Sequence, residues 1–479
     1  MKRLCLIAVL APLLLLSCTE GKHVPTEAEL SAFGNYVYSL DSTLTGKWFD
    51  RMGVSAQAGE LLDYLRSELP RHGLDTTAFF VPQIAEDLMI VHTLAFDSVG
   101  QSINEVLKRL DDNLSKAYVD YAMGQRYGFI RPEKVFNRLQ LNPDSTGYVR
   151  LFDYDVKAPD DGEAEHALTS SSDRMAFLRA SEPVSHVYKT LQTALMNTTD
   201  HEKRQTIIVN MERCRWQMKQ PGIGERMILV NIPSQQLWAV CPDSVLNMRI
   251  CCGATTTKTP LLSSFITHMQ VNPEWIIPHK IVKSDVARHG GDSAYFGRNN
   301  YYIIDRNSGD TLHPAEVSRA ELESGRLRVG QRGGAGNSLG RIVFRFLNNF
   351  SIYLHDTNNR GAFKRERRTL SHGCVRVEKP FELACFLWPD ATEWDQERLR
   401  LSMDFAPVTD RGREYLEEHE DAPRPLRLVS YQKVMPQIPV YIVYFTAYPS
   451  PETGTVDFWP DIYGYDKVVV SHLQPFMAR

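Results

Sequence analysis

A change in hydrophobic periodicity near residue 225 divides the chain into two unlike parts. Upstream, apolar residues recur at helical spacing, as at Leu61, Leu62 and Leu65, and this predicts amphipathic helices. Downstream, short β-rich runs begin with residues 227–232 and 237–240, which flank a turn typical of a hairpin. The sequence therefore predicts an α+β protein in which a helical domain precedes a β-rich domain.

Other segments extend this two-part prediction. Helices are expected at residues 102–110, 114–127, from Pro132 onward and at 185–196, with a capping-box pattern at Thr26 and Glu29. Residues 158–172 are polar and acidic and are expected to form a loop or hinge. Strands are expected at residues 246–251, 265–271, 301–305, 342–346, 352–355 and 440–447. Residues 279–336 are rich in glycine and charge, which predicts an irregular insert of the kind used as a lid or binding loop.

The first 18 residues have the pattern of a targeting segment. Lys2 and Arg3 precede an apolar run, residues 4–16, which is too short to span a bilayer as a helix. The run ends before Cys18 in a pattern typical of a bacterial lipoprotein cleavage site, and an ordinary signal peptide is the alternative. Both place the mature chain outside the cytoplasm, and lipidation of Cys18 predicts a periplasmic protein anchored to a membrane.

The overall charge argues against nucleic acid as a partner. The 54 basic and 58 acidic residues give a net charge of −4, so no basic excess is available to neutralise phosphates. Six cysteines follow Cys18, and their spacing matches no common zinc pattern. One or two disulfides stay open in an oxidising compartment, while buried packing is expected for Cys241, Cys252 and Cys385.

The segment 353–376 carries the residues with evident chemistry. A thiol becomes a strong nucleophile when an imidazole or a helix N-terminus favours its deprotonation. Cys374 follows Gly373, which permits close backbone approach, and is expected at a strand-to-helix turn. The amides of Gly373 and Cys374 are then candidates to hold an oxyanion. His355, at a strand end, is the expected general base, and His372 is the competing candidate.

These residues alone leave three interpretations open. The first is a nucleophilic cysteine with a histidine base. The second is a zinc site formed by His355, His372 and Cys374, although a cation such as Arg376 beside a zinc ligand would be unfavourable. The third is a buried structural cluster without chemistry.

The same segment, with Tyr-x-His-Asp at 353–356 and Ser-His-Gly-Cys-Val-Arg at 371–376, resembles the signature of L,D-transpeptidases with a YkuD-type catalytic domain. The likeness covers roughly residues 205–466. Upstream, residues 117–128 and the Gly73-Leu-Asp75 turn resemble the scaffold domain of the large subgroup of that family. Further motifs that carry the resemblance are residues 210–213, Lys258-Thr-Pro260, Asn272 to Pro278, Gly336 to Arg341 and Asp461-Ile-Tyr-Gly464.

The resemblance implies a reaction on the peptide stems of bacterial peptidoglycan. Cys374 would attack the amide between the third and fourth stem residues and release D-alanine. The thioester would pass to an amine of a second stem and give a 3→3 cross-link. His355 would be the general base, with Asp356 or its carbonyl holding the imidazole tautomer.

The resemblance also implies contacts with substrate and inhibitors. Arg376 suits a substrate carboxylate or carbonyl, with a structural ion pair as the alternative. Tyr353 aligns with an active-site tyrosine, and Trp275 is either a substrate platform or core. No cofactor or metal is implied, and penem-type β-lactams are expected to acylate Cys374.

The predicted organisation is a signal peptide at 1–18, a helical scaffold domain at 19–205 and a catalytic domain at 206–470 with a lid at 279–336. No counterpart of a helical peptidoglycan-binding module is evident between residues 160 and 205. The acceptor stays open between a second stem, water, as in an L,D-carboxypeptidase, and an envelope protein. A non-catalytic wall-binding lipoprotein is the alternative from another class.

Overall fold

The computed structural model describes residues 46–50, 53–142, 146–157, 162–170, 173–216, 218 and 226–478. The expected targeting segment with Cys18 and the capping box at Thr26 lie outside the described residues. None of the described helices is long and apolar enough to cross a membrane.

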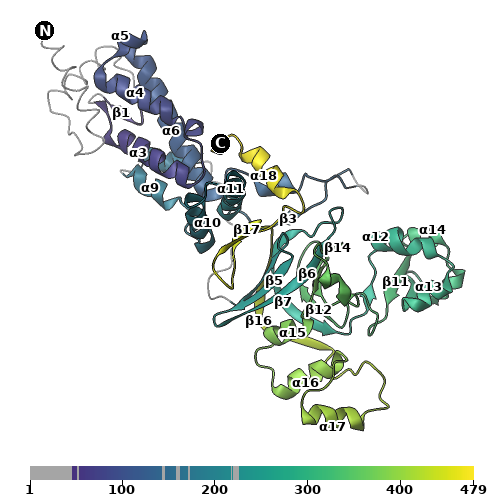
Figure 1. The fold of residues 1–479 in the computed structure, drawn as a ribbon. Helices are drawn as coiled ribbons and strands as arrows, with labels where there is room; N and C mark the ends of the chain where they lie inside the picture. Colours follow the sequence, from purple (N-terminus) through teal and green to yellow (C-terminus); the bar gives the residue numbers. More distant parts are fainter. Residues whose placement is uncertain are drawn as a thin grey trace, which may run out of the picture.

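The N-terminal part is an elongated helical bundle, drawn in purple and blue in Figure 1. Its longest helix, α6, begins at a capping box in which Ser102 and Glu105 satisfy each other's backbone amides. The two segments expected at 102–110 and 114–127 are therefore one continuous helix. The bundle buries its own apolar core around Leu65, Leu107 and Tyr121. Its helices are α3 (Ala56–Arg71), α4 (Val81–Thr93), α5 (Phe96–Val99), α6 (Ile103–Tyr127), α8 (Glu163–Ser170) and α9 (Arg174–Ala180).

The expected loop at residues 158–172 is only partly a loop. Residues 163–170 form helix α8, and its Ala164 and Leu168 are buried. Tyr127 donates a hydrogen bond of 2.6 Å to Glu163 and so connects α8 to α6. The polar composition of the segment suggested a loop, but packing against α6 stabilises a helix.

The second part is built on a strongly curved sheet. Its strands follow the order β12-β13-β15-β6-β5-β4-β16-β7-β3, with β14 paired to β6. The additional pairing of β12 with β7 closes the sheet into a barrel. The strands are β3 (Phe152–Asp153), β4 (Met227–Asn231), β5 (Gln236–Cys241), β6 (Ser244–Gly253), β7 (Leu261–Val271), β12 (Ile342–Phe346), β13 (Leu354–His355), β14 (Thr369–Ser371), β15 (Val375–Val377) and β16 (Tyr431–Val443).

The barrel core confirms the expected β-rich domain. The predicted hairpin is β4–β5, paired from Met227↔Val240 to Asn231↔Gln236. Ile228, Val230 and Ile442 share one face of the sheet and are fully buried in one apolar cluster. Residues expected as one strand at 440–447 divide between the end of β16 and β17 (Ala447–Pro449), which pairs with β18 (Val456–Phe458).

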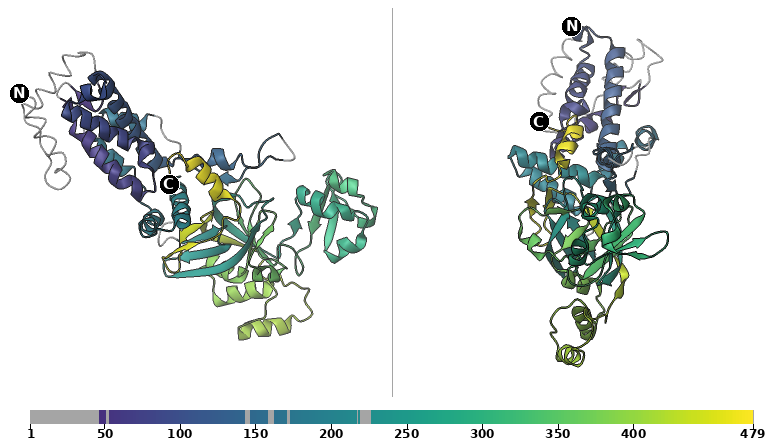
Figure 2. Two further views of the ribbon diagram at one scale, coloured as in Figure 1. Left: turned by 45° about the horizontal axis from the view of Figure 1, so that its top comes forward. Right: turned by 90° about the vertical axis from the view of Figure 1, so that its right-hand side faces the viewer.

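The boundary between the two parts differs from the expected division at residue 205. That position falls inside helix α11 (His201–Arg215), and α7 (Pro132–Phe136), β3 and α10 (His186–Met196) also contribute to the barrel core. The chain end returns to the helical bundle, where Asp75 N–H donates to Phe476 O at 2.9 Å. Figures 1 and 2 show α18 (Tyr465–Leu473) beside α11 at this junction.

Residues 273–340, which we call the insert, form a compact subdomain rather than the irregular stretch expected at 279–336. It projects from the barrel on the side away from the helical bundle (Figure 2). A sheet of order β10-β9-β11-β8 and a separate apolar core around Phe296, Ile303 and Val329 hold it together. Its elements are β8 (Trp275–Ile276), α12 (His279–Ile281), α13 (Ser293–Arg298), β9 (Tyr301–Asp305), β10 (Thr311–Leu312), α14 (Arg319–Glu323) and β11 (Leu327–Gln331).

A small helical lobe follows the barrel strand β15. Its helices are α15 (Pro380–Leu387), α16 (Glu393–Ser402) and α17 (Asp410–Glu418). Leu383, Ala384 and Leu399 join the barrel core, so this lobe packs on the barrel rather than standing apart.

Candidate active site

Two adjacent strands bring four of the predicted site residues onto one face. β13 and β15 are parallel, with Leu354 opposite Val375 and His355 opposite Arg376. Because side chains alternate along a strand, Leu354 and Val375 point into the core, where both are fully buried. Tyr353, His355, Cys374 and Arg376 therefore share the opposite face.

Cys374 lies in a tight turn between strands β14 and β15. The first helix beyond it, α15, begins only at Pro380. The expectation of a strand-to-helix turn is therefore wrong. The short strand β15 intervenes because Val375 and Val377 are needed to fill the barrel core.

Gly373 is required for its backbone conformation rather than for the close backbone approach that was expected. Its φ of +118° lies in a region that side chains disfavour, whereas the nearest atom to an added Cβ would be 3.7 Å away. Its amide donates to Ser371 Oγ at 3.2 Å, and Ser371 Oγ donates to Cys374 O at 2.5 Å. The Gly373 amide is thus engaged within the turn, so Cys374 N–H is the better candidate to hold an oxyanion.

Two buried side chains from distant segments brace this turn. Thr259 Oγ1 donates to Gly373 O at 2.8 Å and accepts from Gly253 N–H at 2.9 Å. Tyr463 accepts from Thr259 N–H at 3.2 Å and donates to Gly253 O at 2.6 Å. Neither residue is assigned a role from the sequence, although both stand in motifs of the resemblance, at 258–260 and 461–464.

We expect Thr259→Val to loosen the turn while preserving side-chain volume. It leaves Gly373 O and Gly253 N–H without their buried partner, which should lower the free energy of unfolding by about 1–3 kcal/mol. Misplacement of Cys374 should slow its acylation by roughly ten- to a hundredfold. Urea unfolding and penem acylation rates measure the two effects, with exposed Thr255→Val as control. Unchanged acylation in Thr259→Val would show that the bracing is dispensable.

The orientation of His355 suits a base. Its imidazole is buried, and Nδ1 lies 2.5 Å from the carbonyl oxygen of Asp356. A carbonyl accepts only, so we assign the proton to Nδ1, which leaves the Nε2 lone pair available. Of the two partners considered for this role, the Asp356 carbonyl is the one observed, rather than its carboxylate.

The Asp356 carboxylate instead fixes the backbone around the site. Its Oδ2 accepts from Arg341 N–H at 2.8 Å, and its Oδ1 pairs with Arg360 at 2.8 Å. Gly340 packs so closely that an added Cβ would lie 2.4 Å from this carboxylate, and its φ is +62°. The motif from Gly336 to Arg341 therefore holds the strand end that carries His355.

Near pH 7 the Cys374 thiol and the His355 imidazole are both uncharged. Burial raises the pKa of Cys374 to about 11, although the Tyr353 amide and the charges of Arg345 and Arg376 oppose this. Burial and the Arg376 charge lower the pKa of His355 to about 3, although its hydrogen bonds with the backbone of Asp356 and Leu339 act in the opposite direction. Near pH 7, proton transfer from sulfur to nitrogen must therefore accompany attack on a carbonyl rather than precede it.

Tyr353 links the thiol to the insert. Burial and the nearby Cys374 raise the pKa of its hydroxyl to about 12, while a hydrogen bond from Trp275 acts in the opposite direction. The Arg345 guanidinium lies 4.4 Å from the Tyr353 ring centroid. Trp275 also packs against the core of the insert, so it is both core and part of the site wall.

Arg376 carries an unused donor at the site. Its Nε is buried and has no hydrogen-bond partner, and none of the ion pairs of the described residues involves it. The alternative of a structural ion pair is therefore unsupported. Buried donors are almost always satisfied, so this guanidinium is suited to a substrate carboxylate or carbonyl.

His372 points away from the predicted base position. Its side chain is 47% exposed, and Nε2 lies 3.5 Å from Asp285 Oδ2 in the insert. Since His355 is instead buried against Asp356, the geometry does not support a zinc site made from both histidines and Cys374. His372 connects the turn to the insert.

The other cysteines in the part of the chain that the structure describes are free thiols. Cys251 lies opposite Arg376 in β6 and packs with Ala362 and Phe363, whereas Cys252 points into the barrel core. The expected burial holds for Cys252, but Cys241 and Cys385 are only partly buried.

Comparison with known proteins identifies both parts of the chain. Residues 225–391 match the model of the L,D-transpeptidase catalytic domain of the YkuD type, and residues 45–195 match the model of the scaffold domain. A curated Haemophilus influenzae protein named "Putative L,D-transpeptidase" is 29% identical over 325 residues. That match covers 66% of this chain and 60% of the relative.

The solved structures found to be similar include the following two. One is an L,D-transpeptidase from Mycobacterium smegmatis, with 10% identity, a TM-score of 0.21 and coverage of 45% of this chain and 58% of that one. The other is the avibactam carbamoyl enzyme of Ldtfm, with 13% identity, a TM-score of 0.21 and coverage of 69% and 80%. The chain therefore carries a scaffold domain, at residues 45–195, followed by a YkuD-type L,D-transpeptidase catalytic domain, at residues 225–391.

Proposed function

We propose that this protein is a peptidoglycan L,D-transpeptidase that forms 3→3 cross-links through a thioester on Cys374. The observation that carries the proposal is the shared face of Tyr353, His355, Cys374 and Arg376 within the matched catalytic domain. A cysteine, a tautomer-fixed imidazole and an unused guanidinium are the parts that acyl transfer to an amine requires.

In the proposed first half-reaction, Cys374 Sγ attacks the carbonyl carbon between the third and fourth stem residues. His355 Nε2 takes the thiol proton as the S–C bond forms. The oxyanion is held by Cys374 N–H, and Arg376 neutralises nearby substrate charge. Collapse of the tetrahedral intermediate breaks the C–N bond, and the departing D-alanine amine receives the proton from His355.

The second half-reaction reverses these steps with a new amine. The side-chain amine of a second stem attacks the thioester carbonyl and gives up a proton to His355. The C–S bond breaks, and the proton returns to Cys374. Attack by water instead would release a tripeptide stem, which is the L,D-carboxypeptidase reaction.

The test is incubation of the soluble chain, without residues 1–18, with disaccharide tetrapeptide, followed by intact-protein mass spectrometry and product analysis. An adduct on Cys374, free D-alanine and dimeric stems would support the transpeptidase. Tripeptide without dimers would replace it by the carboxypeptidase. A folded protein with neither adduct nor turnover would contradict both and favour a binding role.

We also propose a periplasmic location with a lipid anchor at Cys18. The support is the positively charged start, the short apolar run and the cysteine that follows it. In Cys18→Ser, membrane fractionation should show loss of the mature membrane-bound form. Unchanged membrane retention would contradict lipidation of this residue.

A further inference from the structure

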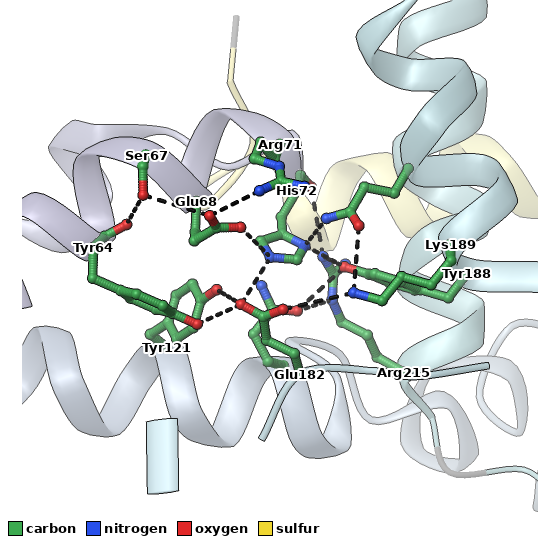
Figure 3. A network of polar contacts seen from close by, with 12 residues as sticks. Tyr64, Ser67, Glu68, Arg71, His72, Tyr121, Glu182, Tyr188, Lys189 and Arg215 are labelled. Carbon is green, nitrogen blue, oxygen red and sulfur yellow. Dashed lines mark hydrogen bonds and ion pairs between the residues drawn. The ribbon is translucent and has the colours of Figure 1, made fainter. Parts of the chain in front are cut away.

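A histidine and two glutamates converge in the helical bundle, far along the chain from the active-site motif. Glu68 lies in the last turns of α3, His72 caps the C-terminus of that helix, and Glu182 follows α9. His72 Nε2 is 3.9 Å from Glu68 Oε2 and 3.6 Å from Glu182 Oε1. Figure 3 shows both carboxylates pointing at this one ring nitrogen.

The ring nitrogen that faces the carboxylates is unsatisfied. His72 is completely buried, and its Nε2 has no hydrogen-bond partner among the described residues. The other nitrogen, Nδ1, lies 2.6 Å from Tyr188 Oη and 3.2 Å from Gln192 Nε2, and these contacts fix the ring orientation. Ligation by Nε2 requires that Nδ1 carries the proton and donates it to Tyr188 Oη. A buried, aimed and unpaired nitrogen between two carboxylates calls for a bound group, because such atoms are rarely left without a partner.

We propose that Glu68, His72 and Glu182 bind one divalent transition-metal ion, with Zn²⁺ as the best match. One ligand atom from each residue falls in a group whose members all lie within 4.8 Å of one another. Atoms about 2.1 Å from a tetrahedral zinc ion stand about 3.4 Å apart, so the observed 3.6 and 3.9 Å need only a small contraction. One imidazole and two carboxylates are ligands that zinc accepts, with water as the fourth.

Glu68 keeps an inner oxygen, Oε2, for the ion, whereas the inner oxygen of Glu182, Oε1, is shared with two tyrosine hydroxyls. The outer oxygen of Glu68 pairs with Arg71 at 3.0 Å, and that of Glu182 lies 3.7 Å from Lys189. Tyr64 and Tyr121 donate hydrogen bonds to Glu182 Oε1 and orient it toward the centre (Figure 3). Such outer contacts are typical of metal ligands.

The two carboxylates lie nearer the surface than the imidazole. The Glu68 and Glu182 side chains are 15% and 17% exposed, whereas His72 is at 0%. An ion can therefore enter past the carboxylates. Arg215 of α11 contacts His72 O at 3.5 Å, so the site lies at the junction between the bundle and the barrel. A bound ion would connect α3 to the segment after α9 at this junction and stabilise it.

The experiment uses the full soluble chain after removal of metal by chelation. Isothermal titration with Zn²⁺ should give one ion per chain, and excess Zn²⁺ should raise Tm by several degrees. Co²⁺ in the same site should give visible d–d absorption bands, which report ligation independently of activity. His72→Gln and Glu182→Gln should weaken binding more than about a hundredfold and remove the bands. The matched control is His186→Gln, an exposed histidine on α10.

A protonated His72 bridging two carboxylates is the competing state, and it predicts no uptake of metal. Absence of a stoichiometric zinc site in folded wild-type protein would overturn the proposal. Equal binding in wild type and both cluster variants, with loss in His186→Gln, would do the same. Circular dichroism and penem acylation confirm that each variant is folded, so that loss of binding is not loss of the fold.

Discussion

Cys374→Ala is expected to abolish both thioester formation and stem-peptide turnover, with a fall in rate of at least roughly a thousandfold. Cys251 lies on the same face of the sheet, opposite Arg376, but it belongs to β6 and not to the turn that Thr259 braces at Gly373. The side chain is partly buried and packs at the edge of the barrel core, so its truncation should leave the fold intact. Intact-protein mass spectrometry after incubation with a penem measures the covalent adduct.

The matched control is Cys241→Ser. Cys241 is a partly exposed thiol, and a hydrogen bond with Ser244 lowers its pKa, which makes it the competing candidate for adventitious acylation. Full labelling and turnover are expected in Cys241→Ser. An adduct that persists in Cys374→Ala and disappears in Cys241→Ser would reverse the assignment of the nucleophile.

His355→Ala is expected to reduce acylation by about 10²–10⁴-fold at neutral pH, the usual range for a general base. His372→Ala should have a far smaller effect, because its exposed ring faces Asp285 rather than the buried base position. Acylation rates of Cys374 at saturating and subsaturating penem separate the chemical step from binding. Similar losses from both substitutions would refute His355 as the base.

The pH profile gives a second readout for His355. Wild-type His355 is neutral above about pH 3 and the thiol stays protonated below about pH 11, so the acylation rate should show no inflection near 6.5. Without the base, reaction depends on the thiolate fraction, so the rate in His355→Ala should rise about tenfold per pH unit below 11. A purely structural role for His355 would lower the rate equally at every pH.

Local patterns explain which parts of the fold could be predicted. The β4–β5 hairpin and helix α10 depend on short-range alternation, a turn and an N-cap, and the sequence predicts them correctly. The composition of the insert predicted an irregular segment. Its apolar core could not be predicted, because it joins Phe296 to Val329, positions that only tertiary folding brings together. Local composition does not report such packing.

The active site likewise contains residues that the sequence identifies and residues that only the fold brings into place. The motif identifies Cys374 and His355, since their chemistry is visible in residue type and spacing. Thr259 contacts Gly373 across 114 positions of the chain, and only the barrel closure places it there. The helix N-terminus expected behind Cys374 was wrong because β15 occupies the intervening residues.

The two ends of the insert meet at the barrel rim. Asn272 N–H donates to Arg341 O at 2.7 Å, and the next pair outward, Val271 and Ile342, already stand opposite each other in β7 and β12. The insert therefore occupies the position of a hairpin loop between β7 and β12, and a short Asn-Gly turn could close the same two strands. Because the two ends of the insert lie side by side, a whole subdomain can be inserted, deleted or exchanged during evolution without any change in the strand pairing of the barrel. Variation among relatives at this position should therefore occur as changes in subdomain size rather than in strand register.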